Sequence, residues 1–148
     1  MYKRAEASRL YREFEEKKTA HLTALKLLHV RTTPNSNEGR KKRAISVKIN
    51  KLVEDWNLGY QTQILPNYHD LHGMTTGGAL HYVQRLVGMA LKKKGKTIIR
   101  LETGRGNNSP GRVPAIKTAP LAIYQNVAGC RIGLEPGNND GIVRITVS

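Results

Sequence analysis

The sequence predicts an α/β domain with a mixed four-stranded sheet, preceded by a two-helix N-terminal extension. The first observation is that residues 61–148 show strand and helix patterns in the order strand, helix, strand, helix, strand, strand. The second is that residues 1–60 carry apolar side chains at spacings of three and four, the period of an amphipathic helix. The third is size, because 148 residues of which 39% are hydrophobic suit one compact core. Strands joined through helices tend to be parallel and a closing hairpin is antiparallel, so the sheet is expected to be mixed.

The extension consists of two predicted helices with a loop between them. The first helix runs from residue 3 to about residue 30, with Phe14 and Leu25 on its apolar face. Residues 31–43 contain Pro, Gly, Asn and Ser without periodicity and end in a basic run, which is typical of a flexible loop. A second helical pattern follows, and we expect it to close near Gly59.

The predicted α/β domain begins with the short strand "YHDLHG", which stops at Gly73. Thr75 or Thr76 can cap the next helix, whose apolar stripe ends in a run of lysines. A β-branched strand over residues 96–102 comes next. The remaining elements are a helix over 113–129, interrupted or kinked at Pro120, and two strands over 130–135 and 141–147 that form a hairpin.

The charge of the chain predicts a polyanionic partner. Lys and Arg number 25 against 11 Asp and Glu, which gives a net charge of +14. The excess is divided evenly, because residues 1–60 hold 14 basic and 7 acidic side chains and residues 61–148 hold 11 and 4, so each part carries +7. Only 5% of the residues are aromatic, which argues against a broad base-stacking surface. We therefore expect phosphate contacts to dominate the binding of nucleic acid.

Composition also disfavours secreted and membrane proteins. The one cysteine, Cys130, cannot form an internal disulfide, and no run approaches the roughly 20 apolar residues of a membrane span. The first residues, "MYKRAEASRL", are charged where a secretory signal would be apolar. We expect an intracellular protein, or part of a larger intracellular chain, with no membrane partner.

Residues 102–111, "ETGRGNNSPG", have the composition of an anion-binding loop. Gly104 and Gly106 allow backbone conformations that a β-carbon would forbid, so their peptide N–H groups can converge on an anion. Arg105 would then lie at the centre of a phosphate-sized concavity, with the Ser109 hydroxyl beside it.

Asp70 and His72 are the candidate acid–base pair. They lie two apart on a predicted strand and are expected to project from the same face. Because the carboxyl ends of parallel strands meet at one edge, they should approach Arg105 in the loop after the second strand. An imidazole of pKa ~6.5 can move a proton near neutral pH, a carboxylate can orient it, and arginine can offset charge on phosphate oxygens. By itself, an Asp-x-His pair at a strand end is more often a surface or capping arrangement.

Two other phosphate-binding motifs are rejected. "GRGNNS" resembles a dinucleotide-binding loop, but Ser109 replaces the third glycine and no acidic residue follows at the expected distance. "GKT" at residues 95–97 resembles the end of a P-loop, yet six residues lie between Gly88 and Gly95 where that motif has four.

A metal site is the weaker alternative for the same residues. Asp70 and His72 could share an ion, but the sequence has no cysteine cluster, and Glu102, Glu135 and Asp140 have no ligand-like spacing. A mechanism without metal or cofactor is therefore favoured.

The other basic and histidine residues have weaker assignments. A lysine run ends the predicted helix, either as a solvated helix end or as a contact to a nucleic-acid backbone. His21 and His29 are expected at a helix surface or within the helical hairpin. His69 faces away from Asp70 and His72, which favours a structural role. The lysines of this run are Lys92, Lys93, Lys94 and Lys96.

Three motifs together make the chain resemble the Smr (small MutS-related) domain. They are "HDLHG" at 69–73, "TGRGNNS" at 103–109 and "EPGNNDGIVRITV" at 135–147. The resemblance covers roughly residues 67–148. It implies a βαβαββ fold like the C-terminal domain of bacterial translation initiation factor three, and a nuclease activity. It also implies that Asp70, His72 and Arg105 are the catalytic residues.

The chain departs from the Smr pattern at two positions. His69 stands where the family usually has leucine, which concerns packing. Asn108 stands where the family usually has histidine before the loop serine. An asparagine can hydrogen-bond a phosphate but cannot donate a proton as an acid, so activity is open if the chemistry uses that second imidazole.

The helical extension resembles the arrangement of eukaryotic Smr proteins. This resemblance implies an endonuclease that cleaves mRNA at stalled ribosomes in no-go or nonstop decay, in the cytoplasm and without a metal. A non-catalytic RNA- or ribosome-binding adaptor and a DNA-nicking endonuclease are the alternatives. The residues expected to contact nucleic acid are Gly104, Gly106, Asn107, Asn108, Ser109, Lys92, Lys93, Lys94, Lys96 and Arg112.

Overall fold

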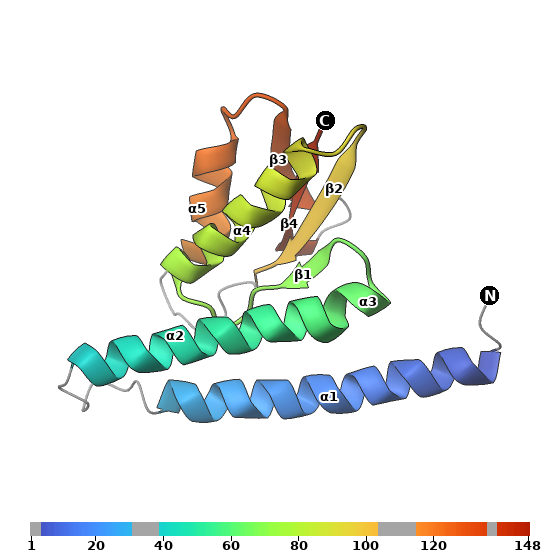
Figure 1. The fold of residues 1–148 in the computed structure, drawn as a ribbon, viewed down its shortest axis with the longest axis vertical. Coiled ribbons are helices and arrows are strands. Elements are labelled where there is room, and N and C mark those ends of the chain that lie inside the picture. Colours follow the sequence, from blue (N-terminus) through green and yellow to red (C-terminus); the bar gives the residue numbers. More distant parts are fainter. Residues whose placement is uncertain (1–3, 31–38, 104–114, 136–138) are drawn as a thin grey trace.

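A computed structural model describes residues 4–30, 39–103, 115–135 and 139–148 of the chain (Figure 1). Helical segments come first and the α/β part follows. The elements in chain order are α1 (Arg4–Val30), α2 (Gly39–Trp56), the π-helical turn η1 (Asn57–Gln61), α3 (Thr62–Ile64), β1 (Tyr68–Asp70), α4 (Thr76–Leu91), β2 (Thr97–Glu102), α5 (Ala115–Tyr124), β3 (Cys130–Glu135) and β4 (Asn139–Val147).

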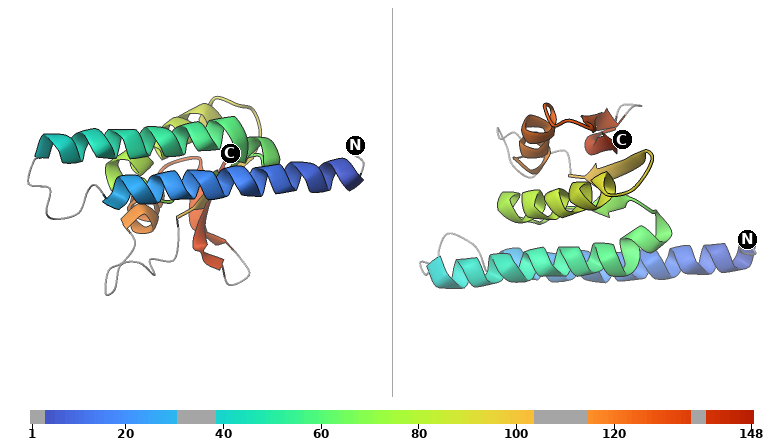
Figure 2. Two further views of the ribbon diagram at one scale, coloured as in Figure 1. Left: turned by 90° about the horizontal axis from the view of Figure 1, so that it is seen from below. Right: turned by 45° about the horizontal axis from the view of Figure 1, so that its top comes forward.

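The four strands form one mixed sheet in the order β1-β2-β4-β3, which confirms the predicted fold class. β1 runs parallel to β2, while β4 is antiparallel to both β2 and β3. The register pairs Asp70 with Glu102, so the last residues of the two parallel strands lie side by side. Helices α4 and α5 pack on the same face of this sheet (Figures 1 and 2).

Local signals in the sequence explain most element boundaries. Helix α4 begins after Thr75, whose hydroxyl accepts a hydrogen bond from the N–H of Gly78, as an N-cap residue does. The turn after α4 uses Gly95 at φ +92°, a conformation that favours glycine. Helix α5 is shorter than predicted and continues through Pro120, which is fully buried.

Two predictions for the extension are wrong at their boundaries. Helix α2 begins at Gly39, so the basic run at 40–43 is helical, in keeping with the good helix propensity of Arg and Lys. The helical segment also continues through Gly59 to Ile64, because a π-helical turn accommodates the glycine. The Thr62 hydroxyl donates a hydrogen bond to the carbonyl of Asn57 across this turn.

The extension packs on the α/β part instead of projecting from it. Helices α1 and α2 lie side by side and antiparallel (Figures 1 and 2). Leu25 of α1 and Ile49 and Val53 of α2 are buried in the same hydrophobic cluster as Leu71 and the residues of α4 and the sheet. Residues on both sides of residue 60 therefore contribute to one core.

Aromatic contacts hold α1 against the end of α2. The ring of Phe14 lies 5.4 Å from that of Trp56, and His21 stacks on the same indole at 4.9 Å. Burial lowers the pKa of His21. Of the two positions expected for His21, the structure shows the one within the helical hairpin, where the half-buried ring stacks on the indole of α2.

None of the described helices is both long enough and apolar enough to cross a membrane.

The shared core predicts that one substitution in α2 destabilises the whole fold. Ile49 is 2% exposed, so Ile49→Ala should lower the free energy of unfolding by about 2–5 kcal/mol, in one transition seen equally by helix and sheet probes. Val47 on the same helix is 66% exposed, and Val47→Ala should change stability by about 0.5 kcal/mol or less. Equal effects of the two substitutions in chemical denaturation would contradict a shared core.

Candidate active site

Asp70 is positioned by the parallel pairing of β1 and β2. It is the last residue of β1, and the N–H of Leu71 continues the ladder by donating to the carbonyl of Glu102 at 2.9 Å. Leu71 is fully buried and fixes the chain as it leaves the sheet. His72 lies after the strand, so a turn and not strand alternation brings its side chain back to Asp70.

Asn57 in the π-helical turn holds the backbone of Asp70 from the other side. Its side-chain oxygen accepts from the N–H of Asp70 at 2.7 Å, and its amide nitrogen donates to the Asp70 carbonyl at 2.7 Å. The same nitrogen donates to the carbonyl of Val53 at 3.0 Å, and Asn57 is fully buried. An amide that is a donor and an acceptor can replace a neighbouring strand at the edge of a sheet. Strand β1 is therefore fixed to the helical segment.

Asp70 and His72 form a hydrogen-bonded dyad. His72 Nδ1 lies 2.6 Å from Asp70 Oδ1, and the backbone N–H of His72 donates to the same oxygen at 3.0 Å. The Asp70 side chain is 4% exposed and that of His72 is 42% exposed. When Nδ1 carries the proton toward Asp70, Nε2 presents a lone pair. The dyad therefore has the arrangement of an acid–base catalyst oriented by a buried carboxylate.

The two groups shift each other's pKa values in opposite directions. Burial alone would raise the pKa of Asp70, but the hydrogen bonds and charge of His72 and the nearby Lys18 lower it. The hydrogen bond to Asp70 raises the pKa of His72, against burial, and the charges of Asp70 and Glu102 add to the effect. Each charged form stabilises the other, so His72 stays protonated to a higher pH than an isolated histidine would.

Glu102 is a site residue that sequence spacing provides no reason to include. Its Oε1 lies 4.0 Å from His72 Nδ1, and its Oε2 accepts a hydrogen bond from the Tyr68 hydroxyl at 3.0 Å. Burial and this carboxylate raise the pKa of Tyr68. Parallel pairing brings Glu102 beside Asp70 from a distant part of the sequence, a relation that no local pattern encodes.

Asp70, His72 and Glu102 also have donor atoms close enough to hold a cation. One ligand atom from each lies within 4.8 Å of the others, a mixed oxygen and nitrogen set that small divalent ions accept. In the structure Asp70 instead has two protein partners, because Lys18 Nζ lies 3.5 Å from its Oδ2 and His72 Nδ1 lies 2.6 Å from its Oδ1. Cation binding would require Lys18 to move away from the carboxylate.

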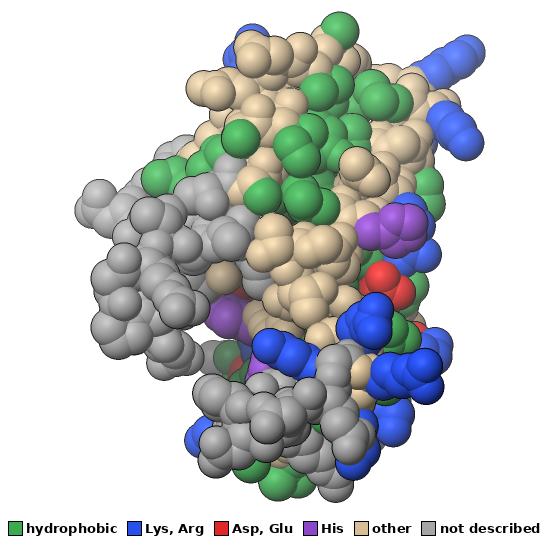
Figure 3. Space-filling model, turned by 90° about the vertical axis from the view of Figure 1, so that its left-hand side faces the viewer, with side chains coloured by type: hydrophobic (Ala, Val, Ile, Leu, Met, Phe, Trp, Pro, Cys, Tyr) green, Lys and Arg blue, Asp and Glu red, His purple; other side chains and the backbone are tan. Residues whose placement is uncertain are grey.

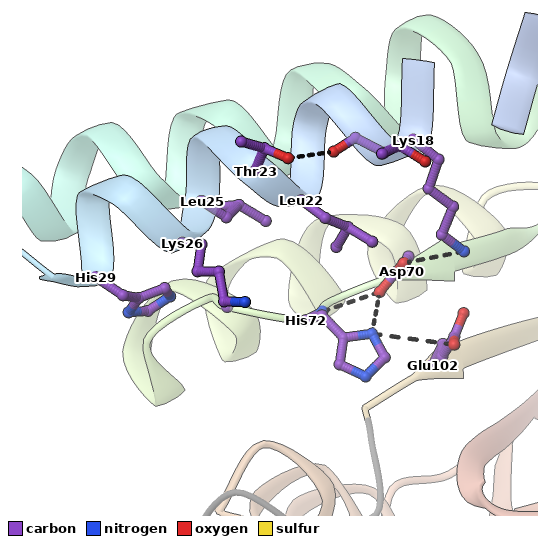
Figure 4. Close-up of a pocket in the computed structure, with 11 residues that line it drawn as sticks. Lys18, Leu22, Thr23, Leu25, Lys26, His29, Asp70, His72 and Glu102 are labelled. Carbon is purple, nitrogen blue, oxygen red and sulfur yellow. Dashed lines mark hydrogen bonds and ion pairs between the residues drawn. The ribbon is translucent and has the colours of Figure 1, made fainter. Parts of the chain in front are cut away.

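The dyad lies at the end of a pocket of about 590 Å³ between α1 and the sheet edge (Figure 4). Lys18 and Leu22 of α1 point toward the dyad from one side, and Glu102 lies on the other. The lining residues from the α/β part are Asp70, His72, Gly73 and Glu102.

The structure does not describe the anion-binding loop. Gly104, Arg105, Gly106, Asn107, Asn108, Ser109 and Arg112 lie outside the described residues. Thr103 is described, is buried and immediately follows Glu102, with its N–H donating to the Gly141 carbonyl. The loop therefore starts beside the dyad, as the parallel strands predict, and its contacts stay a prediction.

The lysine run lies away from the dyad. Lys92, Lys93, Lys94 and Lys96 are exposed and precede β2, whereas Glu102 ends that strand. Six strand residues at about 3.3 Å each separate the two ends of β2. The lysines are therefore not neighbours of the dyad, and their contact with a nucleic acid stays a prediction.

His69 has the structural role that its position predicts. It is 4% exposed, and its Nδ1 forms a 2.8 Å hydrogen bond with the Tyr82 hydroxyl on α4. Burial lowers the pKa of His69 to about 4, so it is neutral at physiological pH.

Positive charge gathers over the helical extension. Figure 3 shows Lys and Arg side chains concentrated over the lower part of one face, where α1 and α2 lie, with hydrophobic side chains above them. Arg40, Lys42 and Lys48 of α2 are exposed. The electrostatic attraction of a polyanion is therefore directed toward the helices as well as toward the sheet.

Comparison with known structures supports an Smr-type fold. The chain is similar to the solution structure of the B3BP Smr domain, with 25% sequence identity and a TM-score of 0.51. The alignment covers 71% of this chain and 97% of that chain. No family model and no curated protein matches the sequence. The likeness therefore supports the fold expected from the sequence motifs, and the roles of the motif residues stay a prediction.

The dyad predicts a specific titration behaviour for His72. Its pKa should lie above the ordinary 6.5, and Asp70→Asn should lower it, because burial then acts without the carboxylate hydrogen bond. The stability that the protonated His72 contributes is present below its ordinary pKa of 6.5 and is lost as pH rises through the raised folded pKa. At the acid end it is lost as pH falls through the lowered pKa of Asp70. NMR titration of the His72 ring measures the shift. Glu102→Gln, which removes a carboxylate at 4.0 Å, should lower the pKa less, and an unchanged pKa in Asp70→Asn would contradict the dyad.

Proposed function

We propose that this protein is an RNA endonuclease, in which His72 transfers protons and Asp70 orients the His72 ring. The observation that carries the proposal is the 2.6 Å contact of His72 Nδ1 with the buried Asp70 carboxylate at the end of a pocket. Nothing in that arrangement requires a metal, because an imidazole can exchange a proton near neutral pH.

The substrate's own 2′-hydroxyl is the proposed nucleophile. It attacks the adjacent phosphorus, the 2′-oxygen to phosphorus bond forms, and the bond from phosphorus to the 5′-oxygen breaks. If neutral His72 removes the 2′ proton at Nε2, solvent protonates the leaving 5′-oxygen. If protonated His72 gives its Nε2 proton to the leaving 5′-oxygen, solvent takes the 2′ proton. The products are a 2′,3′-cyclic phosphate and a 5′-hydroxyl. This route favours RNA over DNA, because DNA has no 2′-hydroxyl.

Arg105 and the loop around it are the proposed phosphate clamp. Thr103, the residue two positions before Arg105, ends the described segment beside Glu102. A guanidinium can grip two phosphate oxygens and offset the charge that grows on them during the reaction. The backbone of Gly104 and Gly106 would supply further donors to the same group.

The biological substrate we propose is mRNA on stalled ribosomes, in the cytoplasm. The support is the resemblance to Smr domains that follow a helical extension, together with the net charge of +14, which suits a ribosome surface rich in RNA. This proposal goes beyond the structural likeness, which supports an Smr-type fold and does not identify a substrate.

Substitution of the dyad should abolish cleavage of single-stranded RNA. His72→Ala should lower the rate by about 10²–10⁴-fold, the usual contribution of a general acid or base. His81→Ala is the matched control, because His81 is an exposed histidine on α4 away from the pocket, and it should retain the wild-type rate. EDTA should leave the rate unchanged. Gel analysis of end-labelled RNA gives all of these rates.

Each contrary result identifies an alternative. Loss of cleavage in EDTA would indicate that Asp70, His72 and Glu102 bind a metal ion that the reaction needs. Nicking of DNA with the same dependence on His72 would identify a DNA nickase. Binding of RNA without cleavage, on free RNA and on ribosomes, would identify an adaptor, for which Asn108 in place of the family's usual histidine is the supporting observation.

Arg105→Ala should separate the clamp from the acid–base pair. Loss of one preorganised charge-stabilising donor reduces turnover by about 10²–10³-fold, while the pKa of His72 should stay as in the wild type. The assay is cleavage of mRNA on purified stalled ribosomes, with His72→Ala beside it. Unchanged cleavage in both variants would show that the reaction does not need the proposed active-site residues.

A further inference from the structure

Helix α1, which lies outside the part of the chain that resembles an Smr domain by motif, forms most of one wall of the pocket. Lys18 and Leu22 project from α1 toward the dyad (Figure 4). The residues of α1 that line the pocket lie at helical spacing. They are Lys18, Thr19, Leu22, Thr23, Leu25, Lys26 and His29.

Lys18 joins this wall directly to the dyad. Its Nζ lies 3.5 Å from Asp70 Oδ2, and its side chain is 25% exposed while that of Asp70 is 4% exposed. The ammonium therefore borders both the buried carboxylate and the open pocket. A substrate phosphate in the pocket would meet this charge next to His72.

Lys26 extends the positive charge along the same wall. It is exposed and lies eight positions after Lys18, about 12 Å farther along the helix axis at 1.5 Å per residue. Its side chain reaches toward the pocket (Figure 4). Leu22 lies between the two lysines and is 42% exposed, so the wall alternates charge with an apolar surface.

This wall has the chemistry of a nucleotide-binding surface. Two ammonium groups suit phosphates, and an exposed leucine between them suits the apolar face of a base. The pocket volume of about 590 Å³ is within the range of small-molecule sites and is open to solvent at the exposed His72. An acidic peptide would also match the lysines, but it has no flat bases to cover the exposed Leu22 between them.

We propose that Lys18 and Lys26 form a phosphate-binding subsite for the single-stranded RNA that the dyad cleaves. The inference rests on the proposed function for the identity of the strand. It makes α1 a part of the active site, and it makes Lys18 a residue that exchanges its contact with Asp70 for one with substrate phosphate.

The test is the salt dependence of RNA binding. The full chain is titrated into a fluorescent single-stranded RNA with 2′-O-methyl groups, which cannot undergo the proposed cleavage. A plot of log K against log salt becomes shallower by about 0.7 for each single-strand phosphate that the protein no longer neutralises. The double variant Lys18→Gln/Lys26→Gln should bind more weakly, with a slope shallower by about 1.4, if each lysine neutralises one phosphate.

Matched variants separate this subsite from general electrostatics. Lys48→Gln removes a lysine of α2 that is exposed and does not line the pocket, and it should keep the wild-type slope. Lys18→Arg keeps a cation beside Asp70 and should restore most of the affinity that Lys18→Gln loses. Thermal melts of each variant confirm that the helix remains docked.

The results also separate this inference from the proposed function. A double variant with the wild-type slope, a Lys48→Gln variant with an equal loss, or a chain that does not bind the RNA would overturn the subsite. Lysine-dependent binding without cleavage of ordinary RNA would retain the subsite and overturn the endonuclease. Cleavage of ordinary RNA without lysine-dependent binding would retain the endonuclease and overturn the subsite.

Discussion

The buried carboxylate of Asp70 is the constraint on which the site depends. A carboxylate that is 4% exposed requires compensating partners, because burial of an unpaired charge costs several kcal/mol. One oxygen accepts two hydrogen bonds from His72, and the other faces Lys18. Asn57 holds the backbone of Asp70 through its own N–H and carbonyl. The geometry of the dyad and the docking of the helices therefore follow from the same requirement.

The helical extension is consequently part of the site and not a separate module. Asn57 comes from the turn after α2 and Lys18 from α1, yet both contact the last residue of β1. The hydrophobic core crosses the same boundary through Leu25, Ile49 and Val53. Displacement of α1 would remove a cation from Asp70 and open one wall of the pocket, so any partner that binds α1 would also act on the dyad.

Local sequence patterns predict the helices, the strands and the dyad, but they do not predict the contacts that form through tertiary packing. Alternation, β-branching and the Thr75 cap identify the strands and α4, and parallel topology places Asp70 near the start of the glycine-rich loop. The turn at Gly59 is missed because the π-helical turn depends on the buried Asn57 side chain. Lys18 is one of 25 basic residues, and its contact with Asp70 exists only after α1 docks. Glu102 joins the site through strand register, which sequence spacing does not encode.

The central claim is that the dyad activates the RNA's own 2′-hydroxyl, and the chemistry of the product ends tests it most directly. The full chain is incubated in EDTA with an RNA strand and with a matched strand in which the nucleotide at the mapped cleavage site is 2′-deoxy. The account predicts a 2′,3′-cyclic phosphate and a 5′-hydroxyl from the RNA, and no cleavage at the deoxy position. Cleavage at the deoxy position, or products that end in a 5′-phosphate, would contradict it, because water and not the 2′-hydroxyl would then attack the phosphorus.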